Sequence, residues 1–185
     1  MIDELPTLPA RRRLGNLADI RPTVIIDTRE QDPLPIRRLS VLRAALQTGD
    51  YSFAGGEELF AVERKTIVDL IGCCCGGRER FERELHRLRG YRFKRLVFVG
   101  SREEVERGGY RSSVRPASVL HSLAAWEVRF DVPVVWCPDA AAAAEQVEAW
   151  VFWFAREVVK NANALLPSRT ASAAEVIPLA ARSGA

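Results

Sequence analysis

The amino-acid sequence predicts an α/β fold in which helices flank a central mixed β-sheet. Over most of the chain, short β-branched and aromatic runs alternate with longer segments whose apolar residues follow helical spacing. The composition of the 185 residues, 48% hydrophobic and 28% charged, is that of globular domains and excludes collagen-like, coiled-coil and wholly disordered chains. No apolar run reaches the roughly 20 residues of a membrane span, and the N-terminal residues lack the apolar stretch of a secretory signal.

The first half of the chain is predicted to contain short strands joined by turns. Thr23–Asp27 (TVIID) is a β-branched, apolar run typical of a buried strand. A proline-containing loop follows at residues 31–35, and residues 39–46 form either a strand or a short helix. Residues 49–51 begin with a glycine and are predicted to turn the chain, and Glu58–Lys65 is a further strand with an apolar centre.

The second half is predicted to alternate helices with buried strands. Thr66 suits the N-cap of a first helix, which ends at two adjacent glycines. The elements expected after it are a helix over Arg78–Arg89, a strand over Lys94–Gly100, a helix over Val114–Phe130, a strand over Pro133–Cys137, and a helix capped by Asp139 that runs to about Asn161.

These elements predict one domain with two flexible ends. Residues 1–22 are polar, contain prolines and a cluster of three arginines, and are expected to form a flexible arm. Residues 23–162 hold every predicted element and form the expected domain. Residues 163–185 are rich in alanine, serine and proline and are expected to form a flexible tail.

Acidic side chains lie near the predicted strand ends, where α/β folds build their sites. Asp27 ends the first strand, and Asp50 lies in the glycine turn. Glu63 and Lys65 share one face near the end of a later strand. Clustered carboxylates repel one another unless a cation neutralises them, and such oxygen ligands suit Mg²⁺. The Glu-x-Lys spacing also occurs on solvated, ion-paired strand faces, so this pattern alone leaves both interpretations open.

A longer set of motifs resembles the XPF-type nuclease domain of structure-specific DNA endonucleases. The motifs are Asp27-Thr28-Arg29-Glu30, Gly49-Asp50, and Glu63-Arg64-Lys65 followed four positions later by Asp69. They are similar in order and spacing to that family's D-x-R-E, G-D and E-R-K-x-x-x-D signature, and the resemblance covers about residues 23–160. It implies a restriction-endonuclease-like fold of the PD-(D/E)XK superfamily.

The same resemblance implies hydrolysis of DNA with Mg²⁺ or Mn²⁺, often at branches, flaps or junctions. By position, Asp50 and Glu63 would be the main metal ligands, and Asp27 would be a further acidic ligand. Lys65 would be a water-positioning base or an electrostatic stabiliser of the reacting phosphate.

Four further positions carry supporting roles by resemblance. Arg29 and Arg64 would contact phosphate or brace the carboxylates. Glu30 and Asp69 would be supporting groups, and either could hold an arginine instead of the metal. With the three acidic ligands and Lys65, they complete the candidate catalytic set.

The positive charge is concentrated in one stretch. The whole chain carries 27 basic and 24 acidic residues, a net charge of +3, whereas residues 78–95 carry eight basic and three acidic residues, a net charge of +5. Arginines bind phosphates without reading the base sequence, which favours DNA contact. The candidate DNA-binding residues are Arg78, Arg80, Arg83 and Arg87. The alternative is a solvated helix face with Glu–Arg pairs four residues apart.

The predicted function is therefore a metal-dependent DNA endonuclease that acts at branched, flap or junction DNA in repair or recombination. Two alternatives stay open: a catalytically silent DNA-binding or scaffold subunit of a nuclease complex, and a restriction-type nuclease with sequence specificity. The expected partners are DNA, a second copy of the chain bound through the nuclease domain, and a protein that directs the enzyme to its substrate, with no membrane.

The expected location follows from the absence of an export signal. The four cysteines fit neither a disulfide framework nor a zinc site. The chain is therefore expected in the reducing cytoplasm, associated with the nucleoid or, in a eukaryote, in the nucleus.

Overall fold

In the computed structural model, which describes residues 16–165, these residues contain six strands in one sheet. The strands are β1 (Thr23–Asp27), β2 (Ser40–Ala44), β3 (Tyr51–Phe53), β4 (Phe60–Thr66), β5 (Phe93–Val99) and β6 (Val134–Cys137). Their order is β2-β1-β3-β4-β5-β6, with β3 antiparallel to β1 and β4 and every other pair parallel. The mixed sheet predicted from the sequence is confirmed.

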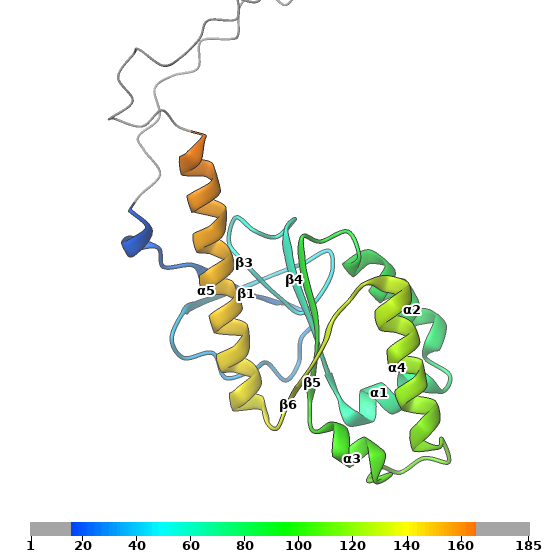
Figure 1. Cartoon of the computed structure of the whole chain (residues 1–185). Coiled ribbons are helices and arrows are strands. Elements are labelled where there is room, and N and C mark those ends of the chain that lie inside the picture. Colours follow the sequence, from blue (N-terminus) through cyan, green and yellow to red (C-terminus); the bar gives the residue numbers. More distant parts are fainter. Residues whose placement is uncertain (1–15, 166–185) are drawn as a thin grey trace, which may run out of the picture. The chain divides into compact units, whose positions relative to one another are not determined.

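Helices cover both faces of this sheet (Figure 1). They are α1 (Ile67–Cys74), α2 (Arg78–Leu88), α3 (Arg102–Glu106), α4 (Pro116–Phe130) and α5 (Ala140–Ala164), preceded by a short 3-10 turn, η1 (Leu17–Asp19). The first part of α5 lies against one face, and α1, α2 and α4 lie on the other. Within the described residues, no helix is long and apolar enough to cross a membrane.

Alternation along the strands divides the core into two layers. On the α5 side, the rings of Phe60 and Phe93 stack at 4.6 Å and both contact Phe154 of α5. On the other side, Phe81 of α2 meets Trp126 of α4 with ring centroids 5.0 Å apart, and both side chains are buried. Aromatic burial of this kind holds helices to a sheet and fixes their position over it.

Two short elements differ from the expectation. Residues 51–53 form strand β3, where the sequence predicts a turn at residues 49–51 and no strand, because three residues are too few for periodicity to show. Residues 102–106 form the one-turn helix α3, which the sequence analysis missed although Ser101 caps it. Residues 39–46, left open between strand and helix, contain the strand β2.

The described residues divide into two compact units, residues 21–155 and residues 16–20 with 156–165. Within the smaller unit, the guanidinium of Arg156 donates to the carbonyl oxygen of Leu17 at 2.5 Å. Residues 17–19 of the predicted N-terminal arm form the turn η1. The rest of that arm, residues 1–15, and the tail from residue 166 onward lie outside the described residues.

Candidate active site

The sheet topology brings three carboxylates to neighbouring central strands, since Asp27 ends β1, Asp50 directly precedes β3 and Glu63 lies in β4. Because β1 and β3 are antiparallel, the end of β1 meets the start of β3, and the Asp27 N–H donates to the Asp50 carbonyl oxygen at 2.8 Å. The Asp50 N–H in turn donates to the carbonyl oxygen of Val62 in β4 at 2.8 Å, which places Asp50 beside Glu63. Residues far apart in the sequence thus meet through backbone pairing alone.

Gly49 makes this approach possible. Its φ is +81°, in the left-handed region that side chains rarely adopt, and a Cβ atom there would lie 3.0 Å from the Val62 carbonyl oxygen. The glycine before Asp50 is therefore needed for the turn that carries the aspartate against β4.

Asp50 and Glu63 form a pair of carboxylates with unused binding capacity. Asp50 Oδ2 accepts the Arg64 N–H at 2.7 Å, and Glu63 Oε1 accepts from Lys65 Nζ at 2.5 Å. The other oxygen of each carboxylate has no donor among the described residues. Burial, and then the charge of Glu63, raise the pKa of Asp50 to about 8, and burial also raises the pKa of Glu63.

This donor set fits a hard divalent cation. Two adjacent carboxylates repel each other when both are charged, and a bound cation neutralises this repulsion. Among residues 16–165, no group of three or more His, Cys, Asp or Glu side chains converges as a ready-made metal cage. Mg²⁺ and similar ions at phosphate-processing sites use one or two carboxylates and complete their coordination with water and substrate oxygens. The site accordingly suits Mg²⁺ or Mn²⁺, with part of the coordination left to substrate and water.

Lys65 lies between two acids. Its Nζ is 2.5 Å from Glu63 and 3.5 Å from Oε2 of Glu84 on α2, and it sits 5.5 Å from the centroid of the Phe81 ring. Burial lowers the pKa of this ammonium, but the charges of Glu63 and Glu84 outweigh it and raise the pKa above its ordinary value. Lys65 is therefore a cation at neutral pH, a state that suits charge stabilisation better than proton abstraction.

Sequence reasoning missed Glu84, which was treated only as a charge offsetting nearby arginines. A usable signal was present, since Arg80, Glu84 and Arg87 recur at helical spacing and so share one face of α2. The direction in which that face points depends on how α2 packs on the sheet, and this packing cannot be read from the sequence.

Asp27 is held differently from the other two acids. Its carboxylate accepts four hydrogen bonds, three from Arg29 and one from the Leu46 N–H at 2.6 Å. Burial alone would raise the pKa of Asp27, but these bonds outweigh burial and lower it. Because a carboxylate offers about four acceptor sites, a metal ion would have to displace one of these donors.

Arg64 points to the opposite face of β4, as the alternation predicts. Its guanidinium lies 2.9 Å from Asp32 and 3.9 Å from Glu30, and its buried Nε has no hydrogen-bond partner among the described residues. Glu30 thus faces an arginine, one of the two arrangements expected for it. Arg64 braces the loop after β1.

Asp69 takes part in the N-terminal cap of α1. Its Oδ2 accepts from the Thr66 N–H at 3.0 Å and the Thr66 hydroxyl at 2.7 Å, while Thr66 Oγ1 accepts the Asp69 N–H. This reciprocal capping box confirms Thr66 as the N-cap. Asp69 therefore shapes the helix that follows Lys65.

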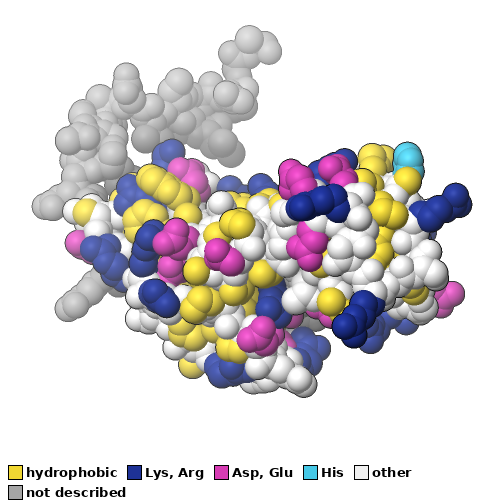
Figure 2. Space-filling model, turned by 90° about the horizontal axis from the view of Figure 1, so that it is seen from below, with side chains coloured by type: hydrophobic (Ala, Val, Ile, Leu, Met, Phe, Trp, Pro, Cys, Tyr) yellow, Lys and Arg dark blue, Asp and Glu magenta, His cyan; other side chains and the backbone are white. Residues whose placement is uncertain are grey.

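The four candidate DNA-binding arginines of α2 divide into two groups. Arg78 packs against α4, with its guanidinium 4.9 Å from the Trp126 ring and 2.5 Å from the Ser122 hydroxyl, and its side chain stays 41% exposed. Arg80, Arg83 and Arg87 are exposed, and the charge of Arg87 offsets a small part of the rise that burial causes in the pKa of Glu63. On the face in Figure 2, basic and acidic side chains are interspersed rather than gathered by sign.

A hollow of about 530 Å³ opens beside the candidate site. Lys65, Asp69 and Arg80 line it, together with the glycines between α1 and α2. A cationic, solvent-open hollow next to two carboxylates is a suitable place for a phosphate group.

Comparisons with known proteins agree with this architecture. The model of the ERCC4 domain family matches residues 26–149. The fold is similar to that of XPF from Aeropyrum pernix, with a TM-score of 0.59 and 23% identity over 76% of this chain and 69% of that chain. A structure of XPF from Aeropyrum pernix in complex with DNA matches with a TM-score of 0.58 and 24% identity, over 74% of this chain and 66% of that chain. No curated protein matches.

Proposed function

This chain belongs to the ERCC4 domain family, and on that premise we propose that it is a metal-dependent endonuclease that hydrolyses phosphodiester bonds in DNA. The observation that carries the proposal is the pair Asp50 and Glu63, each with a carboxylate oxygen left without a donor, beside the ammonium of Lys65. Asp27 is not included among the ligands, because Arg29 and the Leu46 N–H already occupy its acceptor sites.

Each residue of the site has a proposed task. Mg²⁺ or Mn²⁺ bound by Asp50 and Glu63 would activate water and neutralise phosphate charge. Lys65, oriented by Glu63 and Glu84, would stabilise the negative charge that develops on the phosphate oxygens. Arg29 has a side chain that is 71% exposed and is oriented by Asp27, so it is suited to contact the phosphate backbone.

The proposed substrate is branched, flap or junction DNA in repair or recombination. Its backbone would lie along α2, where Arg80, Arg83 and Arg87 are exposed. Arg78 packs on Trp126, so its proposed role is to hold α2 against α4 rather than to contact DNA. A DNA substrate implies action inside the cell, with a further protein as a candidate for targeting.

The test is cleavage of a panel of single-stranded, duplex, flap and four-way DNA, each with Mg²⁺, Mn²⁺ or EDTA. The wild-type chain should cleave at least one branched substrate only with a divalent ion. Asp50→Asn and Glu63→Gln should each lose this cleavage by about 10²-fold or more while keeping the wild-type circular dichroism spectrum.

Control variants keep the test specific. Arg38→Ala removes an exposed arginine that pairs with Glu145 of α5 and has no place in the candidate site, so it should cleave like the wild type. Cleavage retained in Asp50→Asn or Glu63→Gln would overturn the ligand assignment. DNA binding by the wild-type chain without cleavage of any substrate would favour a catalytically silent subunit.

We also propose that the chain pairs with a second copy. Its edge strand β2 exposes Val41 and Leu42 at 45% and 50%, and α5 exposes Trp153 at 63%. Large apolar side chains on an edge strand favour pairing with another chain. Light scattering should give twice the 20.7 kDa mass of one chain, and a monomer mass at micromolar concentrations would contradict the dimer.

A further inference from the structure

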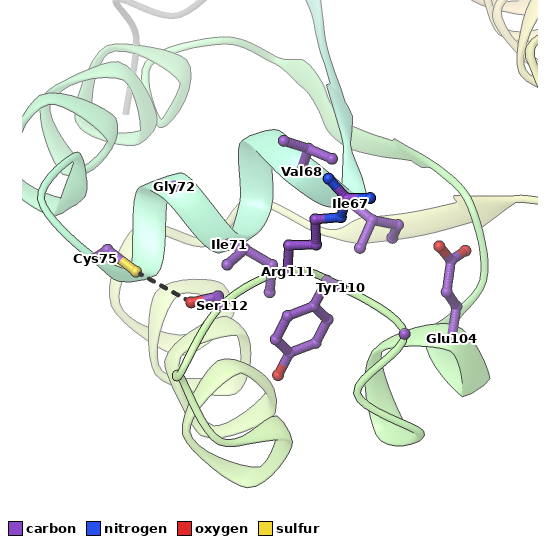
Figure 3. Close-up of a pocket in the computed structure, with 10 residues that line it drawn as sticks. Ile67, Val68, Ile71, Gly72, Cys75, Glu104, Tyr110, Arg111 and Ser112 are labelled. Atoms are coloured by element: carbon purple, nitrogen blue, oxygen red, sulfur yellow. Dashed lines mark hydrogen bonds between the residues drawn. The ribbon is translucent and has the colours of Figure 1, made fainter.

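We propose that a groove along α1, continuous with the candidate active site, binds a single-stranded DNA segment whose bases are unstacked. This inference rests on the proposed nuclease function and adds to it the path of the strand that leaves the site. Its core is a second hollow, of about 590 Å³, between α1 and the loop that joins α3 to α4 (Figure 3).

The two hollows form one path along the exposed side of α1. Both are lined by Val68, Gly72 and Cys75. The first hollow begins at Lys65, and the second extends from those shared residues to Tyr110. A strand held at Lys65 can therefore continue along α1 without leaving the protein surface.

The second hollow has the chemistry that unstacked nucleotides need. Ile67 and Ile71 give it an apolar floor, and the ring of Tyr110 lines its side with the hydroxyl anchored on the Val114 carbonyl oxygen at 2.9 Å. In Figure 3 the side chain of Arg111 extends toward the start of α1, and this exposed guanidinium has no acidic partner among the described residues. An aromatic ring for a base and a cation for a phosphate are the elements of a single-strand binding groove.

Two observations favour single-stranded DNA over other occupants. Cations occur at both ends of the path, Arg80 near Lys65 and Arg111 beyond Cys75, which complements a polyanion. The apolar floor between them requires an exposed base face, and duplex DNA hides its base faces within the stack. Glu104 of α3 bounds the groove, and its charge disfavours a phosphate there and limits the path.

Direct binding of a fluorescent ten-nucleotide oligo(dT) tests the groove without any cleavage. Arg111→Ala should weaken binding and reduce the slope of log affinity against log salt by about 0.7. Tyr110→Leu should weaken binding roughly 5- to 150-fold, whereas Tyr110→Phe, which keeps the ring, should bind like the wild type. Glu104→Gln should bind more tightly, the opposite sign to Arg111→Ala.

Matched controls separate the groove from general charge. Arg107→Ala makes the same charge change four positions before Arg111, but Arg107 does not line the groove, so its binding should stay within about 2-fold of the wild type. Thermal melting of each variant checks the fold, and Tyr110→Phe also controls for the lost hydroxyl bond.

Alkylation of Cys75 locates the oligonucleotide independently. Cys75 is exposed and lies where the hollows join, whereas Cys73 and Cys137 are buried. Bound oligo(dT) should slow iodoacetamide labelling of Cys75 by more than about 5-fold, as read by peptide mass spectrometry. Protection that depends on protein concentration without DNA would instead identify a second copy as the occupant and overturn the proposal.

The outcomes distinguish this inference from the nuclease proposal. Normal cleavage by the wild type, with equal oligo(dT) binding in Arg111→Ala, Tyr110→Leu and Arg107→Ala, overturns the groove and leaves the nuclease intact. Groove-dependent binding in a wild type that cleaves nothing supports the groove and overturns the nuclease.

Discussion

Asp50 holds its proton in the metal-free protein at neutral pH, since burial and the charge of Glu63 raise its pKa to about 8 from an ordinary value of 3.8. The folded chain therefore binds more protons than the unfolded chain between about pH 4 and pH 8. In this window the contribution of Asp50 to stability falls as pH rises. The burial and the neighbouring charge that disfavour the charged form of Asp50 are the same features that favour binding of a cation there.

Asp50→Asn should remove this pH dependence. Without metal, its free energy of unfolding relative to the wild type should increase from pH 5 to pH 8, because the wild type loses stability there and the amide does not titrate. Urea denaturation in EDTA at both pH values measures this. An unchanged pH slope in the variant would contradict the account.

Asp69→Asn supplies a comparison of opposite sign. Burial alone would raise the pKa of Asp69, but hydrogen bonds from Thr66 outweigh burial and lower it. The contribution of Asp69 to stability is therefore present above pH 4 and lost as the pH falls below it. Relative to the wild type, Asp69→Asn should become less stable as the pH rises through this range.

At the scale of elements, the start of α1 depends on the reciprocal bonds between Thr66 and Asp69. Thr66→Ala should destabilise the protein by about 1 kcal/mol, and Thr66→Ser should restore most of this. Because the two side chains form one unit, the double variant with Asp69→Ala should cost less than the sum of the single variants. Full additivity in urea denaturation would show that the box is not energetically coupled.

A second local anchor joins α5 to the loop before β2. The buried carboxylate of Glu148 accepts the backbone N–H groups of Arg37, Arg38 and Leu39 at 2.5 to 3.1 Å. Glu148→Leu should cost about 2 kcal/mol or more, since three donors lose a charged acceptor. Glu145→Leu, which removes an exposed carboxylate one turn earlier, should cost less than about 1 kcal/mol. Equal losses in denaturant titrations would rule out this anchor.

The elements show what periodicity and capping can predict. The bounds of β1 match the predicted run Thr23–Asp27, and the predicted helix over residues 78–89 ends within one residue of α2. Strand β3 could not be predicted, because its three residues owe their pairing to neighbours on both sides. Short elements that depend on tertiary partners carry little signal of their own.

At the scale of the whole molecule, the sequence predicted which residues lie near the site better than what each one contacts. Asp50, Glu63 and Lys65 meet as expected, because strand pairing and alternation determine their positions. The four bonds to Asp27, the packing of Arg78 on Trp126 and the approach of Glu84 depend on loop and helix packing. Those contacts have no local pattern from which to infer them.

The net charge of +3 does not reveal how the acidic and basic side chains are distributed over the molecule. Buried acids lie on the central strands β1 and β4, and exposed arginines lie on the neighbouring helix α2. Such an arrangement suits a substrate that brings phosphates to a metal.

Calorimetric titration of the DNA-free chain with Mn²⁺ at pH 8 tests the central claim most directly, because it needs neither a substrate nor turnover. The wild type should bind Mn²⁺ at one site, Glu63→Gln and Asp50→Asn should lose this binding, and Asp69→Asn should retain it. Binding that persists unchanged in Glu63→Gln and Asp50→Asn, or no binding by the wild type at millimolar Mn²⁺, would contradict the claim that these two carboxylates hold the metal.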